Sequence, residues 1–354
     1  MKLTKVLGTV LCSAMLLVSF AGCAAGGSGK DKVGVSMPTK DLQRWNQDGD
    51  YMKAELEKAG YEVDLQYAAN DVATQLSQVE NMINSGCKVL VIAAIEGSSL
   101  GEALDMAEAK NIPVIAYDRL LMESDTVDYY ATFDNYMVGT IQGEFVRDQL
   151  DLDNADGPFN LEITAGDPGD NNALFFYQGA MDVLNPYIES GKLVVVSGQT
   201  EFSDVATASW KTENSQARAE TILSSFYADG TNVDAWLCSN DSTALGVANA
   251  LAANYTGNYP IITGQDCDIA NVKNMLEGKQ SMSVFKDTRT LADQVVKMVT
   301  QILKGEKVDV NDTKSYNNGK IVVPSYLCDP VFADANNYKQ ILIDSGYYKA
   351  EDIA

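Results

Sequence analysis

Histidine is missing from this sequence of 354 residues. The chain therefore has no Ser-His-Asp or Cys-His nucleophile system and no histidine-ligated metal site. Cysteine is scarce as well. Its six residues are widely spaced, and none forms a Cys-x-x-Cys pair of the kind that binds zinc. A bridge between Cys238 and Cys267 stays open, since both lie near predicted strand ends. We expect neither a metal site nor a cofactor.

Positive charge is also in short supply. The sequence has 26 Lys and Arg residues against 49 Asp and Glu residues, which gives a net charge of −23 at pH 7. A chain this acidic is repelled by nucleic acid and by anionic lipid surfaces. The composition therefore argues against a nucleic-acid partner.

Long apolar runs are absent beyond the N-terminus. There, Lys2 and Lys5 precede an apolar block over residues 6–20, which is short for a membrane span and typical of a secretory signal. The block ends in Ala21-Gly22-Cys23, which resembles the lipobox of bacterial lipoproteins, with Phe20 where leucine is commoner. This resemblance implies that Cys23 becomes the lipidated first residue of the mature chain.

The alternative is an ordinary secretion signal with an incidental cysteine. On the lipobox interpretation, residues 1–22 are a signal peptide and residues 23–31, rich in glycine, are a flexible tether. We expect the mature protein outside the cytoplasm, held at the outer face of the cell membrane through lipid alone.

From Lys32 onward, short apolar runs alternate with longer segments of helical periodicity. The expected strands are residues 33–37, 63–67, 89–93, 114–117, 159–164, 193–197, 235–239, 260–264 and 283–285. The expected helices include residues 173–184, 217–227, 243–253, 269–276 and 291–303. Such alternation predicts an α/β fold with parallel sheets, and the length suggests two doubly wound lobes.

Polar side chains follow nearly every expected strand. They include Arg44-Trp45, Asp118-Arg119, the segment 166–172, Ser239-Asn240-Asp241, Gln265-Asp266 and Lys286-Asp287. In an open parallel sheet, ligands bind at the carboxyl ends of the strands. We therefore expect these side chains to meet around one ligand.

Several segments carry a more specific resemblance. They are Gln75–Met82, Ala116–Arg119, Phe133–Asn135, Asp170–Ala173, Gly264–Asp266 and Val323–Ser325. The chain resembles the type I periplasmic sugar-binding proteins of ABC transporters, in particular the xylose-binding and broad-specificity aldose-binding proteins, from about Lys32 to the C-terminus. The resemblance implies two lobes joined by a hinge of three crossovers, with residues 32–135 plus 287–310 in the N-terminal lobe and residues 136–286 plus 311–354 in the C-terminal lobe.

The resemblance also implies which side chains contact the ligand. The first lobe supplies Arg44, Asp118 and Arg119, together with Trp45 of the family's Arg-Trp pair. The second lobe supplies Asn172, Trp210, Asn240 and Asp266, and Lys286 lies near the hinge. This set suits a monosaccharide, because carboxylates, amides and arginine pair with hydroxyl groups and tryptophan covers the C–H face of a sugar ring.

Less specific interpretations remain. Asp118 and Arg119 fit a solvated surface pair, Asp170-Asn171-Asn172 fits a helix cap, and Lys286 fits a plain surface lysine. A glycoside hydrolase would need two carboxylates facing one bond, one of them with a raised pKa, whereas Arg119 and Lys286 would keep Asp118 and Asp266 ionised. We therefore expect no enzyme.

The function that these observations predict is that of a monomeric solute-binding lipoprotein. It captures xylose, or an aldose of the glucose, galactose or arabinose type, and delivers it to an ABC permease. The alternatives are a receptor for a nucleoside or a furanose signal, and a sugar sensor that feeds a chemotaxis or two-component system.

Overall fold

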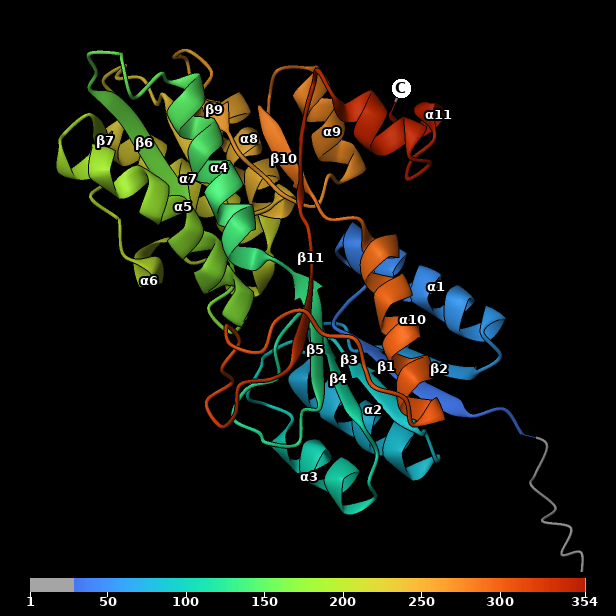
Figure 1. The fold of residues 1–354 in the computed structure, drawn as a ribbon. Helices are drawn as coiled ribbons and strands as arrows, with labels where there is room; N and C mark the ends of the chain where they lie inside the picture. The colour runs from blue at the N-terminus through green and yellow to red at the C-terminus, as the bar shows by residue number, and fades with distance from the viewer. Residues whose placement is uncertain (1–28, 354) are drawn as a thin grey trace, which may run out of the picture. The chain divides into compact units, whose positions relative to one another are not determined.

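The continuously apolar stretch Val89–Ile92 is strand β3 in the interior of a parallel sheet of six strands (Figure 1). Val89 and Val91 pack into one hydrophobic cluster and Leu90 and Ile92 into another. A strand that is covered on both faces needs apolar side chains at every position, which explains the continuous run. These observations come from a computed structural model that describes residues 29–353; the predicted signal peptide, Cys23 and most of the predicted tether lie outside them.

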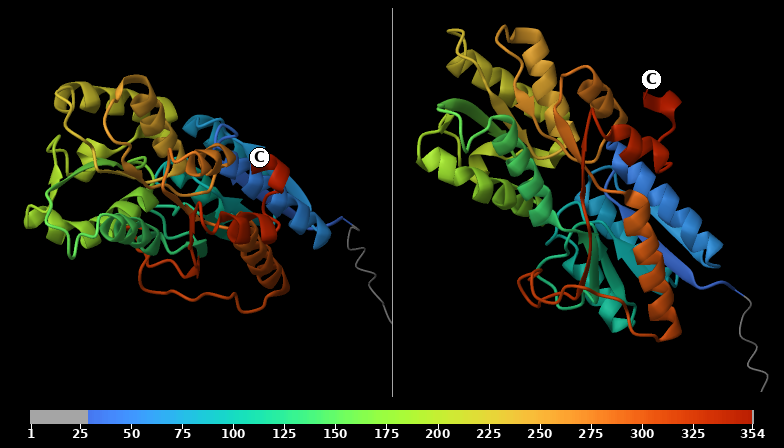
Figure 2. Two further views of the ribbon diagram at one scale, coloured as in Figure 1. Left: turned by 90° about the horizontal axis from the view of Figure 1, so that it is seen from above. Right: turned by 45° about the horizontal axis from the view of Figure 1, so that its top comes forward.

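The first sheet contains only parallel pairs. Its order is β11 (Ser325–Cys328), β5 (Tyr129–Phe133), β4 (Val114–Tyr117), β3, β1 (Lys32–Met37) and β2 (Glu62–Tyr67). Helices α1 (Gln43–Lys58) and α10 (Thr288–Lys304) cover one face, and α2 (Val72–Asn84) and α3 (Gly101–Ala109) cover the other (Figure 2). We call this sheet and its four helices the first lobe.

The second sheet is parallel as well, in the order β7 (Leu193–Val195), β6 (Phe159–Thr164), β8 (Ala235–Cys238) and β9 (Ile261–Ile262). One face is covered by α4 (Asn135–Gln149) and α5 (Asn171–Glu189), and the other by α7 (Thr212–Phe226) and α8 (Asp241–Asn254). The short helices α6 (Phe202–Val205) and η1 (Ala208–Trp210) lie between β7 and α7 in the chain.

Beside this sheet, β10 (Met282–Phe285) pairs antiparallel with β12 (Val331–Asp334). Helix α9 (Ile269–Leu276) shares a hydrophobic cluster with the C-terminal helices η2 (Lys339–Asp344) and α11 (Ala350–Ile353). The second sheet, the β10–β12 pair and their helices form the second lobe. The chain passes between the lobes after β5, after β10 and after β11, so the predicted fold class and its three crossovers are confirmed.

The structure differs from the sequence interpretation in several places. Strands β5, β11 and β12 and helix α4 were not predicted. Strand β11 pairs with β5, so Ser325–Cys328 belong to the first sheet, although residues 311–354 were assigned to the C-terminal lobe. The strand expected over residues 260–264 is reduced to β9, because the Thr263 hydroxyl, rather than the backbone, pairs with both the amide and the carbonyl of Cys238.

The cysteines of the described residues are Cys87, Cys238, Cys267 and Cys328, and all four are free and buried. The pairing of Cys238 with Cys267 that the sequence left open is therefore absent. In the same part of the chain, no helix combines the length and the apolar character needed to cross a membrane.

Candidate ligand-binding site

The carboxyl ends of the strands in both lobes border one cavity. It is lined by Leu42, Arg44, Trp45, Asp118, Arg119, Asp170, Asn172, Phe176, Trp210, Asn240, Gln265, Asp266 and Lys286. All nine ligand-contact residues predicted from the sequence are in this set, and each is at most 8% exposed. Asp118, Arg119 and Lys286 are thus not the solvated surface residues of the alternative interpretation.

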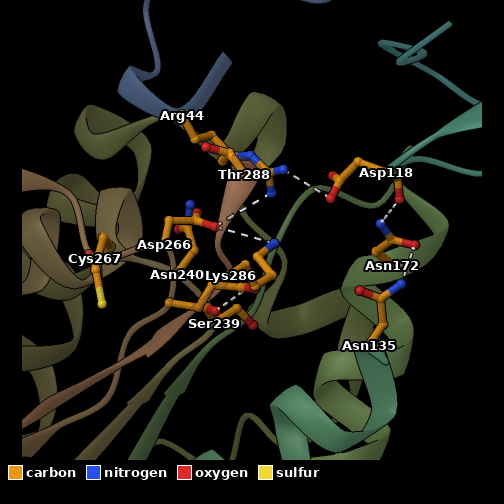
Figure 3. Close-up of polar contacts among 12 residues, drawn as sticks. Arg44, Asp118, Asn135, Asn172, Ser239, Asn240, Asp266, Cys267, Lys286 and Thr288 are labelled. Atoms are coloured by element: carbon orange, nitrogen blue, oxygen red, sulfur yellow. Dashed lines mark hydrogen bonds and ion pairs between the residues drawn. The ribbon is translucent and has the colours of Figure 1, made fainter. Parts of the chain in front are cut away.

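Arg44 lies between carboxylates of the two lobes (Figure 3). Its Nη2 is 3.0 Å from Oδ1 of Asp118, which follows β4, and its Nη1 is 3.5 Å from Oδ1 of Asp266, which follows β9. The same Asp266 oxygen is 3.2 Å from Nζ of Lys286, directly after β10. The Asp266 carboxylate is therefore shared by two buried cations, and one of them, Arg44, comes from the other lobe.

Asp170 forms the centre of a second charged group. Its Oδ2 is 3.1 Å from Nε of Arg119 and accepts a hydrogen bond of 3.2 Å from Nε1 of Trp210. Its Oδ1 accepts from the backbone N–H of Asn172, so Asp170 also caps α5. Arg119 in addition donates to the carbonyl oxygen of Ala94. The cap interpretation of this segment is correct, and the capping residue lines the cavity as well.

The two asparagines of the set are largely held by the protein itself. Asn172 Oδ1 accepts from the Tyr130 hydroxyl at 2.9 Å and from Nδ2 of Asn135 at 3.0 Å, while its Nδ2 donates to the Asp118 carbonyl oxygen (Figure 3). Asn240 Oδ1 accepts from the backbone N–H of Thr243 and caps α8. Each side chain is rigidly oriented, and each keeps amide capacity for one further contact.

Aromatic rings enclose the charged groups. The guanidinium carbons of Arg44 and Arg119 lie 4.6 Å and 5.1 Å from the Trp45 ring centroid, so this ring makes a cation–π contact with both guanidinium groups. Phe176 meets Trp210 edge to face at 6.3 Å and lies 5.4 Å from Nζ of Lys286. Little of the charge in this cavity is in contact with bulk water.

Burial and ion pairing act in opposite directions on the carboxylates. Burial alone would raise the pKa of Asp118, but Arg44, Lys286 and Arg119 together hold that pKa below its ordinary value. For Asp170 burial outweighs the attraction of Arg119, so its pKa is raised. Asp118 is therefore ionised at neutral pH and suited to accept hydrogen bonds from hydroxyl groups.

Three of the lining residues have a left-handed backbone conformation, which is uncommon outside glycine. Their φ angles are 57° at Asp118, 55° at Trp210 and 96° at Asp266. Residues held in such sparsely populated regions cluster at functional sites, where the surrounding structure stabilises them. Asp118 directly follows β4, Asp266 follows β9 by four residues and Trp210 ends η1, and all three side chains line the cavity.

Three buried polar atoms of the lining have no hydrogen-bond partner among residues 29–353. One of them, Nε of Arg119, is ion-paired with Asp170; the other two are Nε1 of Trp45, which can only donate, and Oε1 of Gln265, which can only accept. Buried polar atoms are nearly always paired in folded proteins. A ligand that both donates and accepts hydrogen bonds would pair with Trp45 Nε1 and Gln265 Oε1.

Four lining residues were not predicted as ligand contacts: Leu42, Asp170, Phe176 and Gln265. Gln265 directly precedes Asp266 after an expected strand, so its position was a usable signal. Phe176 follows Asn172 by four residues on one helix, which places both on the same face. Within residues 29–353 no group of three or more His, Cys, Asp or Glu side chains could hold a metal ion.

A family model described as a periplasmic binding protein domain matches residues 33–307. The chain is 49% identical over 328 residues to the multiple sugar-binding periplasmic receptor ChvE of Rhizobium radiobacter, with 92% of each chain covered. It is 35% identical over 353 residues to the D-xylose-binding periplasmic protein of Escherichia coli, with both chains fully covered.

A solved structure adds a relative with a ligand. An ABC transporter solute-binding protein from Clostridium phytofermentans, determined with bound β-D-glucose, is 69% identical and superposes with a TM-score of 0.91, covering 92% of this chain and all of that chain. The resemblance noted in the sequence is thereby confirmed. This chain belongs to the periplasmic binding proteins, in the branch whose relatives are sugar-binding receptors of type I fold.

Proposed function

We propose that this protein captures a neutral aldose in the cavity between its two lobes and delivers it to an ABC permease. The observation that carries the proposal is the pairing of charges in the cavity. Within the lining, Arg44 and Lys286 are matched by Asp118 and Asp266, and Arg119 is matched by Asp170; Asp48 is a further carboxylate on Arg44 behind the lining. An anionic ligand would find every one of these cations already paired with a carboxylate and would add an uncompensated buried charge, whereas a polyol adds only hydrogen bonds.

The relatives support the choice of sugar. The similar solute-binding protein from Clostridium phytofermentans was determined with bound β-D-glucose, and the E. coli relative is a D-xylose-binding protein. Hydrogen bonds to charged groups contribute about 1.5–3 kcal/mol each, so a few such contacts suffice for micromolar binding. The unpaired Trp45 Nε1 and Gln265 Oε1 offer the donor and the acceptor that a hydroxyl group needs.

Binding is coupled to closure of the lobes about the three crossovers. Residues of the two lobes meet in the cavity through Arg44–Asp266 and through Asn172 and the carbonyl of Asp118. A sugar that contacts both sides favours this closed arrangement, because the open form makes only one set of contacts. The closed form is then the one that a permease recognises.

The protein acts as a receptor and not as an enzyme. A glycosidase needs one carboxyl group that stays protonated and a second that faces the same bond. Asp118 is instead kept ionised by its cationic neighbours, and Asp266 is paired with both Arg44 and Lys286. Asp170, whose pKa is raised, is occupied by Arg119, Trp210 and the cap of α5. We propose further that the protein is a monomer, and that it is anchored outside the cytoplasm through lipidated Cys23.

Calorimetry on the mature protein tests the function. D-glucose, D-xylose, D-galactose and L-arabinose form the panel, with adenosine, a furanose and D-glucuronate as comparisons. We expect at least one neutral aldose to bind, with glucuronate far weaker. Preferential binding of the nucleoside or of the charged sugar would contradict the proposal. Loss of metabolic labelling with a fatty acid in a Cys23→Ser variant tests the anchor separately.

A further inference from the structure

A fully buried carboxylate, Asp48, lies behind the cavity and is not part of its lining. It follows Arg44 by four residues on α1, so the two side chains share one face of the helix. Oδ2 of Asp48 accepts from Nε of Arg44 at 3.1 Å and from Nη2 at 3.0 Å. This two-point contact fixes both the position and the plane of the guanidinium.

Asp48 is itself held in place by Tyr117, the last residue of β4. The Tyr117 hydroxyl donates to Oδ1 of Asp48, the oxygen that does not contact Arg44. Tyr117 is fully buried, and burial followed by the nearby Asp48 keeps its pKa well above the ordinary value. It is therefore a neutral donor that orients the carboxylate without altering the charge of the group.

The contacts of Arg44 are consequently divided between two edges. Nε and Nη2 face Asp48, and Nη2 also reaches Asp118, whereas Nη1 meets Asp266 at 3.5 Å, the longest of these contacts. Nη1 is the nitrogen least committed to the protein. A sugar oxygen that competes with Asp266 could therefore accept a hydrogen bond from Nη1 without any reorientation of the guanidinium.

We propose that Asp48 and Tyr117 are positioning residues for sugar binding, which act by holding the Arg44 guanidinium so that its Nη1 edge faces the ligand. This inference rests on the proposed function. Asp48 contacts Arg44 from behind the cavity lining and Tyr117 holds Asp48, so the effect of both residues on affinity passes through the orientation of the Arg44 side chain.

The surroundings of Asp48 supply a readout that a purely structural role would lack. Burial raises the pKa of Asp48 to about 6, and Arg44 partly offsets this effect. Asp118 and the hydroxyl groups of Tyr117, Tyr67 and Tyr347 are the other titratable groups that interact with it. As the pH falls through about 6, Asp48 takes up a proton and its grip on Arg44 weakens, so affinity for a neutral sugar should fall.

The experiment measures the Kd for D-glucose and D-xylose by calorimetry between pH 7.5 and pH 5. Asp48→Asn keeps the shape of the side chain and removes its charge, and Tyr117→Phe removes only the hydroxyl group. Asp50→Asn, an exposed carboxylate on the same helix, is the matched control. Thermal unfolding of each variant reports whether the fold is retained.

We expect Asp48→Asn to weaken binding at least tenfold at pH 7.5, Tyr117→Phe to weaken it about threefold, and Asp50→Asn to leave it unchanged. We also expect the loss of affinity on acidification in the wild type to be absent from Asp48→Asn. If Asp48→Asn does not fold, the threefold loss in folded Tyr117→Phe carries the test alone.

Wild-type affinity in folded Asp48→Asn, or in folded Tyr117→Phe where the first variant fails, would overturn the inference. An unchanged pH profile in Asp48→Asn would do so as well. Failure of the wild type to bind either these sugars or the other aldoses would instead contradict the proposed function, so the two failures are distinguishable.

Discussion

Nη1 of Arg44 in the first lobe lies 3.5 Å from Oδ1 of Asp266 in the second, and the same oxygen is 3.2 Å from Nζ of Lys286. Removal of this carboxylate would leave two buried cations without a shared partner, which costs about 3–5 kcal/mol. We predict that Asp266→Ala abolishes aldose binding in calorimetry and lowers the free energy of unfolding by a similar amount.

The control for this variant is Asp105→Ala, an exposed carboxylate on α3. It should change neither quantity, because surface substitutions away from special features usually have effects within about 0.5 kcal/mol. Full sugar affinity in Asp266→Ala would show that the ligand does not lie between Arg44 and Lys286.

Gly166, after β6, lies against the ring of Trp210. A Cβ at position 166 would overlap three ring carbons of Trp210, so alanine there displaces the indole from the cavity wall. We predict that Gly166→Ala weakens aldose binding at least tenfold and destabilises the protein by about 1–3 kcal/mol, as overpacking does. Calorimetry and urea unfolding measure the two effects.

Gly101→Ala is the matched control, because a Cβ at the start of α3 meets no atom within 4 Å. Its affinity should equal that of the wild type. Equal aldose affinities in Gly166→Ala and Gly101→Ala would mean that the position of Trp210 does not contribute to binding.

The C-terminal segment connects the lobes away from the cavity. The Tyr348 hydroxyl accepts from Nε2 of Gln43 on α1 at 2.6 Å and donates to the carbonyl oxygen of Cys267 in the second lobe at 3.0 Å. Tyr348 and Cys267 share one hydrophobic cluster of the second lobe, so the bond from Gln43 is the one of these two that exists only while the lobes are together. We predict that Tyr348→Phe shifts the protein toward the open form and weakens aldose binding severalfold, since such a bond contributes about 0.5–1.5 kcal/mol.

Small-angle scattering of the ligand-free protein reports the shift as a larger radius of gyration, with Tyr338→Phe on the same segment as the control. A Tyr348→Phe variant that matches the control in both scattering and affinity would speak against a contribution of this contact to closure.

Asp118 should also make stability depend on pH. Its pKa in the folded state is lowered, against about 3.9 in the unfolded chain, so its ionisation stabilises the fold above that value. This contribution is lost as the pH falls through the lowered pKa. We predict that the decrease in the free energy of unfolding between pH 4 and pH 2 is smaller in Asp118→Asn than in the wild type.

Urea titrations at several pH values give this slope directly. Asp105→Asn should keep the wild-type slope, because its carboxylate is exposed. Identical slopes in Asp118→Asn and the wild type would mean that the surrounding cations do not hold Asp118 in its charged form.

Much of the fold was predictable because local patterns determine it. The run Val89–Ile92 is apolar at every position, and it forms an interior strand covered on both faces. Because ligands bind at the carboxyl ends of the strands in open parallel sheets, the sequence predicts that Arg44, Asp118 and Asp266 meet around one ligand. The structure places all three around one cavity.

What could not be predicted depends on contacts between distant parts of the chain. Strand β11 is recognisable only through its pairing with β5, almost 200 residues earlier, and no local pattern in Ser325–Cys328 predicts that pairing. Likewise, only the structure shows that Asn172 uses most of its amide group within the protein and that Asn240 Oδ1 caps α8. The role proposed for Asp48 could not be predicted either, because a carboxylate four residues after an arginine is typical of an ordinary ion pair on a helix surface.

A crystal structure of the mature protein with the aldose that binds best is the most direct test of the central claim. We predict a single sugar molecule between the lobes, with hydroxyl groups within hydrogen-bond distance of Arg44, Asp118 and Asp266. A sugar bound elsewhere, or one bound in the cavity with these three side chains turned away from it, would contradict the account.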